Sequence, residues 1–301
     1  MPDARPTRAL IITAYIALYV IWGSTYLAIA LAIETLPPFL MAGTRFLVAG
    51  TILFTWMHML GEPRPKRKQW GSAILVGFLL LVVGNGAVCW AQHWVPSGIT
   101  ALTIASTPLW MAVLPWIAHR GPAPRPLVLL GIAIGLVGVG VLGGAMPGTM
   151  DRERAIAFGV LLAAALSWAI GSLWSKALPL PKSPLMAAAV QMLCGGVGLL
   201  AVGFAVGEGA RISLADTSLT SWLALAYLVV FGAIIGFGAF VFLLRWSSPT
   251  RVATYAYVNP VIAVLLGWAF HDEPLSARTF IAAALIIVAV VLIVSVPETT
   301  E

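Results

Sequence analysis

Apolar residues dominate long stretches of the chain, and short polar segments separate these stretches. A helix needs about 20 apolar residues to cross a hydrocarbon core that is roughly 30 Å thick. We predict ten such membrane spans joined by short loops. Their residue ranges are 10–31, 38–60, 71–93, 97–118, 126–145, 155–177, 184–206, 219–244, 250–270 and 278–296. The pattern therefore predicts one all-α integral membrane domain of ten transmembrane helices.

The composition agrees with this pattern. Of the 301 residues, 60% are hydrophobic and 9% are charged, and the mean hydropathy is +0.99. These values lie far outside the range of soluble globular domains. The first apolar run has spanning length and leads into further runs, so we expect it to be a membrane span and not a cleaved signal peptide.

Basic residues are distributed unevenly between the two sets of loops. With the N-terminus placed inside, twelve of the 17 Lys and Arg residues fall in inner segments, four fall in outer loops, and Arg45 lies within a span. The inner twelve are Arg5, Arg8, Arg64, Lys66, Arg67, Lys68, Arg120, Arg125, Lys176, Lys182, Arg245 and Arg251, and the outer four are Arg152, Arg154, Arg211 and Arg278. This positive-inside bias predicts that both termini are cytoplasmic. The run PRPKRK at 63–68 is then an orientation signal, and the net charge of +6 does not indicate a nucleic-acid partner.

Groups for catalysis or metal binding do not cluster along the sequence. The two cysteines, Cys89 and Cys194, fall inside predicted spans, where a free thiol usually packs as a small apolar group. The four histidines lie near span ends and far apart; they are His58, His93, His119 and His271. No P-loop for a nucleotide phosphate is present in the sequence. We therefore expect no enzyme, no metal and no cofactor, which leaves transport, channel and receptor functions.

All eleven acidic residues are predicted to lie in loops, at span ends or in the tails. Proton-driven transporters commonly carry a carboxylate inside the membrane. Its absence from the predicted spans indicates uncoupled, facilitated movement of the substrate down a gradient. The alternative that stays open is a proton path through a histidine near the mouth of a cavity, or through water.

The two halves of the sequence resemble each other. With Pro108 placed on Pro260, an offset of 152, residues 100–141 align with residues 252–293 without a gap. The identical pairs include Ala101 and Ala253, Trp116 and Trp268, His119 and His271, Pro122 and Pro274, and Val139 and Val291. We predict two repeats of five helices, 1–150 and 151–301. Because five is odd, the second repeat would enter the membrane from the opposite side, as alternating access about a pseudo-two-fold axis requires.

Each half carries a proline in the middle of its fourth predicted span, in STP at 106–108 and in VNP at 258–260. A proline there removes one backbone hydrogen bond, and lipid cannot satisfy the freed carbonyl group. We predict helix kinks at Pro108 and Pro260 that bend the two spans around a cavity at the midplane. The alternative is a proline kink that serves packing alone.

Polar and aromatic residues follow helical spacing on several spans. The stripes are Thr100, Thr103, Thr107 and Trp110 on the fourth span, Arg251, Tyr255 and Asn259 on the ninth, and Tyr15, Tyr19, Trp22 and Tyr26 on the first. Single hydroxyl and amide groups commonly form hydrogen bonds between membrane helices, worth about 1 kcal/mol or less each. Taken together, aromatic faces with neutral polar groups suit a pocket for a small zwitterion with a partly apolar side chain.

Arg45 lies seven residues after Pro38, which corresponds to about 10 Å of helix rise into the second span. We favour a structural role, in which the side chain extends to the outer interface and ties the span to a carbonyl group. The alternative is that it attracts a carboxylate substrate or acts in a gate.

Six segments of the chain resemble the EamA family of the drug/metabolite transporter superfamily. They are WGSTYLAIA at 22–30, PPFLMAGTRFLVAG at 37–50, STPLWMAVL at 106–114, GIAIGLVGVGVL at 131–142, ALSWAIGSLWSK at 165–176 and YVNPVIAVLLGWAFHDEPLS at 257–276. The resemblance implies two inverted five-helix repeats, cytoplasmic termini and export of small metabolites, and it is closest to bacterial amino-acid exporters of the YddG type. One departure is that HRGP at 119–122 lacks the acidic residue that HDEP at 271–274 retains as Glu273, so we expect Glu273 to be a helix-end or interface residue.

We therefore predict a bacterial inner-membrane exporter of amino acids, aromatic and other neutral ones, that acts as a monomer in the lipid bilayer. Eight residues are expected to line its central cavity and bind the substrate: Trp22, Tyr26, Thr103, Thr107, Trp110, Trp168, Tyr255 and Asn259. The alternatives are a proton-coupled exporter of another metabolite or drug, such as a purine or sugar derivative, and a non-saturable channel. A receptor would show no flux.

Overall fold

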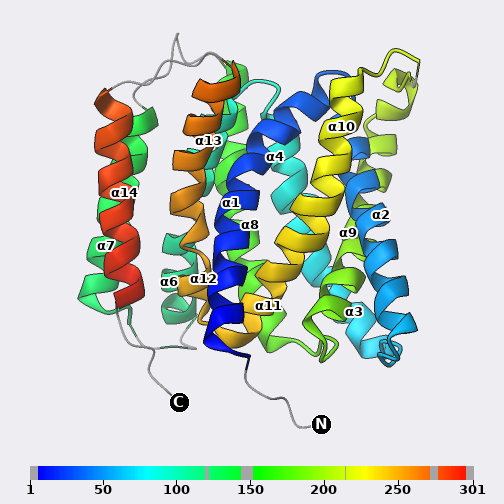
Figure 1. The fold of residues 1–301 in the computed structure, drawn as a ribbon, viewed down its shortest axis with the longest axis horizontal. Coiled ribbons are helices and arrows are strands. Elements are labelled where there is room, and N and C mark those ends of the chain that lie inside the picture. Colours follow the sequence, from blue (N-terminus) through cyan, green and yellow to red (C-terminus); the bar gives the residue numbers. More distant parts are fainter. Residues whose placement is uncertain are drawn as a thin grey trace.

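The computed structural model of the protein describes residues 6–118, 121, 123–143, 152–213, 215–271 and 277–295. Within these ranges every regular element is a helix. The helices lie roughly along one direction, and α1 crosses the middle of the bundle at a tilt (Figure 1). The predicted all-α class is confirmed.

The helices coincide with the predicted apolar segments. In the first half they are α1 (Arg8–Ile33), α2 (Pro38–Met59), α3 (Arg67–Gly77), η1 (Phe78–Asn85), α4 (Gly86–Ala91), α5 (Ser97–Ile104), α6 (Thr107–Ile117) and α7 (Pro126–Gly143). In the second half they are α8 (Arg152–Ala177), α9 (Pro184–Ala205), η2 (Glu208–Arg211), α10 (Leu219–Tyr227), η3 (Leu228–Phe237), α11 (Gly238–Trp246), α12 (Pro249–Val252), α13 (Tyr255–His271) and α14 (Ala277–Ser295). The largest difference is at the start of α3, which begins at Arg67 and was predicted to begin at 71.

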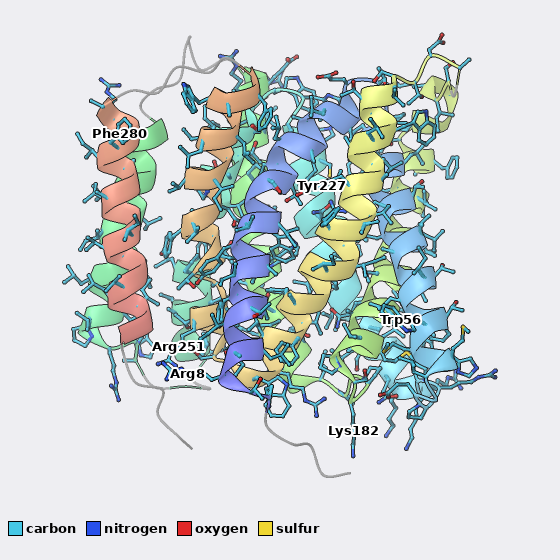
Figure 2. The ribbon with its side chains drawn as sticks, viewed as in Figure 1. Arg8, Trp56, Lys182, Tyr227, Arg251 and Phe280 are labelled. Carbon is cyan, nitrogen blue, oxygen red and sulfur yellow. The ribbon has the colours of Figure 1, made fainter. Side chains whose placement is uncertain are left out.

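Seven of the described helices are long and apolar enough to cross a membrane. These are α1, α2, the continuous helix α3–η1–α4, α8, α9, the continuous helix α10–η3–α11, and α12–α13. Shorter apolar helices occupy Thr107–Ile117, Pro126–Gly138 and Phe280–Ile293. Large apolar side chains such as Trp56 and Phe280 lie exposed on the outside of the bundle (Figure 2). A surface of this kind suits contact with lipid.

Helices α2 and α9 have the same length and start in the same way. Each has 22 residues and begins with a proline, Pro38 or Pro184, whose missing N–H is not needed in the first turn. In α9 the Ser183 hydroxyl accepts a hydrogen bond from an N–H of the first turn at 3.4 Å. In α2 the Glu208 carboxylate accepts hydrogen bonds from two N–H groups of the first turn, at 3.2 and 2.9 Å. A residue from the second half of the chain therefore caps a helix of the first half.

Glycines allow α2 and α9 to pack with their backbones close together. A Cβ atom added to Gly50 of α2 would lie 2.9 Å from the backbone nitrogen of Leu193, and one added to Gly196 of α9 would lie 2.7 Å from that of Leu47. Close approach of this kind is a common way for membrane helices to associate. Helices α7 and α14 form a second pair at the opposite edge of the bundle (Figure 1).

The fourth predicted span of the first half, residues 97–118, forms a helix that is interrupted close to Pro108. Helix α5 ends at Ile104 and α6 begins at Thr107, so Pro108 lies in the first turn of the new helix. Proline has no N–H for the Ile104 carbonyl, and the Thr107 hydroxyl donates to this carbonyl at 2.7 Å instead. A side chain three residues later in the chain thus forms a hydrogen bond to the carbonyl group that the proline leaves without an N–H donor.

The corresponding interruption in the second half does not coincide with Pro260. Helix α12 ends at Val252 and α13 begins at Tyr255, whereas Pro260 lies inside α13. The hydroxyl of Thr254, within the interruption, donates to the Arg251 carbonyl at 2.6 Å. The two halves therefore interrupt their fourth helix at different distances from the proline, and a bend at Pro260 itself stays a prediction.

The third helix of each half contains a π-helical segment. In the first half this is η1 (Phe78–Asn85), and in the second half it is η3 (Leu228–Phe237). Adding the offset of 152 to the bounds of η1 gives 230–237, which lies within η3. Such segments often occur at functional sites.

Candidate functional site

A cavity lies inside the bundle between helices of both halves. Its lining residues are Trp22, Thr25, Tyr26 and Ile29 of α1, Arg45 and Phe46 of α2, Gly84 and Asn85 of η1, Val88 of α4, Ile104 of α5, Ala164 and Trp168 of α8, Gly232 and Phe237 of η3, and Tyr255 and Asn259 of α13. About 60 Å³ inside it is open to the centre of a water molecule, several times the roughly 10–15 Å³ that one water requires. In this conformation the cavity is a small chamber, and six of its sixteen lining residues are aromatic.

Four rings from four helices form an aromatic cluster, which consists of Trp22, Trp168, Phe240 and Tyr255. The Trp22 ring centre lies 4.9 Å from that of Tyr255, 5.1 Å from that of Phe240 and 5.5 Å from that of Trp168. The Trp22 indole N–H also donates to the Gly232 carbonyl at 3.1 Å. These edge-to-face and tilted contacts are favourable ring geometries, and they fix the position of Trp22.

On α1, which begins at the end of the bundle where α14 ends (Figure 1), the cavity-lining residues lie in the second half of the helix. Along α1 the lining starts at Trp22 and continues to Ile29, whereas Tyr19, one turn nearer that end, does not line the cavity. The Tyr19 hydroxyl is instead hydrogen-bonded to the Thr254 hydroxyl at 2.6 Å. This hydrogen bond therefore joins α1 to the segment between α12 and α13, next in the chain to Tyr255 of the aromatic cluster.

Neutral polar groups are held in fixed positions in the chamber. With its amide nitrogen directed at the backbone, Asn259 donates to the carbonyl groups of Tyr255 at 2.9 Å and of Tyr19 at 3.2 Å. The Asn259 side chain is also hydrogen-bonded to the Tyr26 hydroxyl. Because Asn259 joins α1 to α13, it stabilises the wall of the cavity as well as lining it.

Arg45 is buried in the wall of the cavity and is 3% exposed. Its guanidinium carbon lies 4.6 Å from the ring centre of Phe46. Among the residues that the structure describes, Nε and Nη1 of Arg45 have no hydrogen-bond partner. This corrects the favoured interpretation of Arg45 as an interfacial side chain, because the side chain lies against the chamber and does not extend to the end of the bundle.

Five of the eight predicted binding residues line the cavity: Trp22, Tyr26, Trp168, Tyr255 and Asn259. Thr103, Thr107 and Trp110 do not. The Thr103 and Thr107 hydroxyls donate to the carbonyl groups of Ile99 and Ile104 in their own chain segment, at 3.0 and 2.7 Å. Trp110 is packed with other apolar side chains beside Trp168. Helical spacing identified these three residues as a stripe, but it does not determine which neighbour the stripe meets.

Other lining residues were not predicted to bind substrate. Asn85 shares a helix face with Cys89, whose thiol donates to the Asn85 side-chain oxygen at 3.5 Å. Thr25, Phe46 and Phe237 carry no local sequence signal, because a threonine or phenylalanine in a membrane span usually packs against other helices. The charge of Arg45 within a span was a signal for function, since such residues are rare in membranes.

The chamber offers binding groups but no reactive cluster. Within the described parts of the chain, no group of three or more His, Cys, Asp and Glu side chains gathers as metal ligands would. The lining combines aromatic rings, aliphatic side chains, glycines, neutral hydrogen-bonding groups and one arginine. Such a set can bind and orient a small molecule.

The EamA-like transporter family matches this chain twice, at residues 9–144 and 155–295. The chain belongs to the EamA-like transporter family. Together with the apolar helices, this membership makes it a membrane transporter of the drug/metabolite transporter kind.

Relatives and a solved structure agree with this membership. The chain is 42% identical over 283 residues to the "Uncharacterized inner membrane transporter YedA" of Escherichia coli K12, covering 93% of this chain and 89% of YedA. It is 27% identical over 283 residues to a protein of Salmonella typhimurium LT2 named "Probable amino-acid metabolite efflux pump", covering 89% of this chain and 91% of that protein. A solved structure titled "Crystal structure of protein" matches with a TM-score of 0.74 at 20% identity, over 95% of this chain and 96% of that one. This last likeness concerns the fold alone.

Proposed function

We propose that this EamA-family transporter exports amino acids, aromatic and other neutral ones, across the bacterial inner membrane by alternating access. The observation that carries the proposal is the central chamber, in which Trp22, Trp168 and Tyr255 surround a space that Asn259 and Tyr26 make polar. Aromatic rings suit an apolar side chain, while neutral donors and acceptors suit amino and carboxyl groups. A relative named as an amino-acid metabolite efflux pump supports this substrate class.

The transport unit is a monomer of ten spans in two inverted repeats, residues 1–150 and 151–301. The seven long apolar helices, the broken helix α5–α6, and helices α7 and α14 supply the ten spans. Reciprocal packing supports the two-fold relation. A Cβ atom on Gly84 of η1 would collide with the Trp168 ring at 2.8 Å, and one on Gly236 of η3 would collide with Trp22. The first helix of each half thus places a tryptophan against a glycine in the π-helical segment of the other half.

Both termini are cytoplasmic in this proposal. Arg8, Lys182 and Arg251 lie at the end of the bundle where α1 begins (Figure 2). Among the described residues, that end also carries Arg64, Lys66, Arg67, Lys68, Arg125, Lys176 and Arg245, whereas the far end carries Arg152, Arg154, Arg211 and Arg278. The excess of positive charge favours the cytoplasmic side. With this orientation the cavity-lining residues of α1, Trp22 to Ile29, lie in the periplasmic half of that helix.

Transport is uncoupled in this proposal. No carboxylate among the described residues lines the chamber, and Glu208, the buried acid, caps the start of α2. Glu273, Asp272 and Asp151 lie outside the described residues, so the predicted role of Glu273 stays a prediction. Without a carboxylate in the chamber, the simplest driving force is the gradient of the substrate itself.

Uptake into proteoliposomes tests the proposal. Purified protein is reconstituted, and uptake of labelled phenylalanine, threonine and methionine is measured without an ion gradient and then with a pH gradient. We expect saturable uptake without a gradient and trans-stimulation. Uptake only with a pH gradient would establish a proton-coupled exporter, unsaturated flux would establish a channel, and no amino-acid uptake would exclude this substrate class.

The placement of the site has its own test in Tyr255. We expect Tyr255→Ala to lower phenylalanine uptake at least about tenfold, because it removes one ring of the aromatic cluster. Tyr257→Phe is the matched control, since Tyr257 is fully buried outside the chamber and its hydroxyl has no partner among the described residues. Undiminished uptake by a Tyr255→Ala protein with normal thermal stability would exclude this placement.

A further inference from the structure

We infer that Arg45 binds an anionic carboxylate group of the transported molecule, so that a free carboxylate is the feature the transporter selects. This inference rests on the proposed function of the chamber as the transport site. Arg45 is 3% exposed, lines the chamber, and has two guanidinium nitrogens without a partner among the described residues. A buried charge without a partner is costly, and proteins normally pair it or give it a ligand.

The side chains around Arg45 supply no permanent counter-ion. Glu208, the buried carboxylate, is already bonded through both oxygens to the first turn of α2. The other lining residues that the structure describes are uncharged. A guanidinium pairs with a carboxylate through two parallel hydrogen bonds, which are stronger than bonds between neutral groups. The partner that Arg45 lacks is therefore an anion that enters the chamber.

The wall of the chamber holds the guanidinium in place. The ring of Phe46 lies on one side of it, with 4.6 Å between the ring centre and the guanidinium carbon. A Cβ atom on Gly232 would lie 2.8 Å from Nη2 of Arg45. Because glycine leaves this space open, the guanidinium fits against the backbone of η3. A positioned guanidinium loses less freedom when it binds a carboxylate than a flexible surface arginine would.

With Arg45 as the charged group of the chamber, the amino group of an amino acid contributes less to binding than its carboxylate does. A substrate ammonium would meet neutral oxygen and aromatic groups only, since no acidic side chain among the described residues lines the chamber. The aromatic cluster then accommodates the apolar part of the molecule. The expected substrates are small carboxylates with an apolar or aromatic side chain, and amino acids are members of this class.

Competition experiments separate the two charged groups of an amino acid. Proteoliposomes with the wild-type protein take up labelled phenylalanine in the presence of excess 3-phenylpropionate, which lacks the amino group, or phenethylamine, which lacks the carboxylate. We expect 3-phenylpropionate to inhibit uptake and phenethylamine to have little effect. Inhibition by phenethylamine with none by 3-phenylpropionate would overturn the inference.

Variants test whether Arg45 is the responsible group. We expect Arg45→Gln to raise the apparent KM for phenylalanine at least about tenfold and to abolish the preference for 3-phenylpropionate. Arg45→Lys should retain part of that preference. Arg211→Gln removes a charge from an exposed residue at the same end of the bundle and should behave like wild type. An Arg45→Gln protein with unchanged KM and unchanged preference would also overturn the inference.

A binding measurement keeps this test independent of amino-acid transport and of variant folding. The thermal stability of the wild-type protein in detergent is measured with 3-phenylpropionate or with phenethylamine. We expect stabilisation by the acid alone, even if no amino acid is taken up and the proposed substrate class fails. Equal stabilisation by both compounds, or by neither, would contradict carboxylate binding.

Discussion

Helices α2 and α9 share their length, their initial proline and their glycine-lined contact, but they carry different buried polar residues at equivalent positions. Seven residues after the proline, α2 carries Arg45 and α9 carries Gln191. Both side chains are buried, and both have polar atoms without a hydrogen-bond partner among the described residues. Arg45 lines the chamber, whereas Gln191 does not.

Under the alternating access proposed above, this difference would give each side of the membrane its own polar group. The two helices run in opposite directions, so Arg45 and Gln191 lie at equal depth, about 10 Å of helix rise from opposite ends of the bundle. In the conformation described here, the chamber reaches the polar group of α2 only. Under alternating access, the opposite conformation would open the chamber toward Gln191.

A substitution that disturbs the contact between α2 and α9 is expected to change the stability of the protein most. Gly196→Ala would place a methyl group against the backbone of α2, which cannot move aside, and should destabilise the protein by about 3 kcal/mol. Gly71→Ala is the matched control, since a Cβ atom there meets no heavy atom within 4 Å. Thermal unfolding in detergent checks this. If the two variants were equally stable, the close contact of the two helices would not hold.

The next largest effect on stability is expected for the side chains that cap the first turns of α2 and α9. Glu208→Ala removes a carboxylate that bonds two N–H groups of α2 and should cost about 2 kcal/mol. Ser183→Ala removes one longer hydrogen bond in α9 and should cost about 1 kcal/mol or less. Thermal unfolding of both variants gives the comparison. A larger loss for Ser183→Ala would mean that the two starts are not stabilised in the way described.

Replacing Gln191 should change the stability by a smaller amount, and should raise it. Gln191→Leu replaces a buried amide whose nitrogen and oxygen have no partner among the described residues, so the protein should become about 1 kcal/mol more stable. Uptake of phenylalanine should slow if this amide lines the passage in the opposite conformation. Thermal unfolding and proteoliposome uptake measure the two effects. A more stable variant with unchanged uptake would mean that Gln191 contributes to helix packing and does not line the passage.

The smallest effect concerns His93, near the cap of α2. Burial lowers the pKa of His93, with opposing smaller contributions from Glu208 and Arg211. Because the unfolded chain binds the proton more readily, stability should fall as the pH drops below the ordinary histidine value of about 6.5. The wild-type melting temperature should therefore depend on pH slightly more than that of His93→Gln. A steeper dependence in the variant would contradict this sign.

The sequence predicted the helical segments well because apolar length and flanking prolines are local signals. The start of α2 at Pro38 and that of α9 at Pro184 were both predicted correctly. The interruption at 253–254 was not predicted, since it lies at a threonine and not at Pro260. The π-helical segments have no local signature in FLLLVVGN or LVVFGAIIGF, which are as apolar as an ordinary span.

The site was predicted in part. Trp22, Trp168 and Tyr255 were identified as lining residues, and they meet in space although α1, α8 and α13 are far apart in sequence. The threonine stripe was placed in the cavity, yet hydroxyls in a membrane helix often bond to carbonyl groups of their own helix. The environment of Arg45 depends on Gly232, which lies 187 residues later in the chain, so no local pattern could reveal it.

The π-helical segments also affect where the chain can tolerate the deletion of a residue. A one-residue deletion in an ordinary α-helix rotates everything beyond it by about 100°. A π-helical turn holds more residues than an α-helical turn, so η1 or η3 can lose one residue by closing into an α-helix while its flanks stay in register. These two segments are therefore where the protein can absorb a deletion during evolution, with cavity residues on the flanks kept facing the same way.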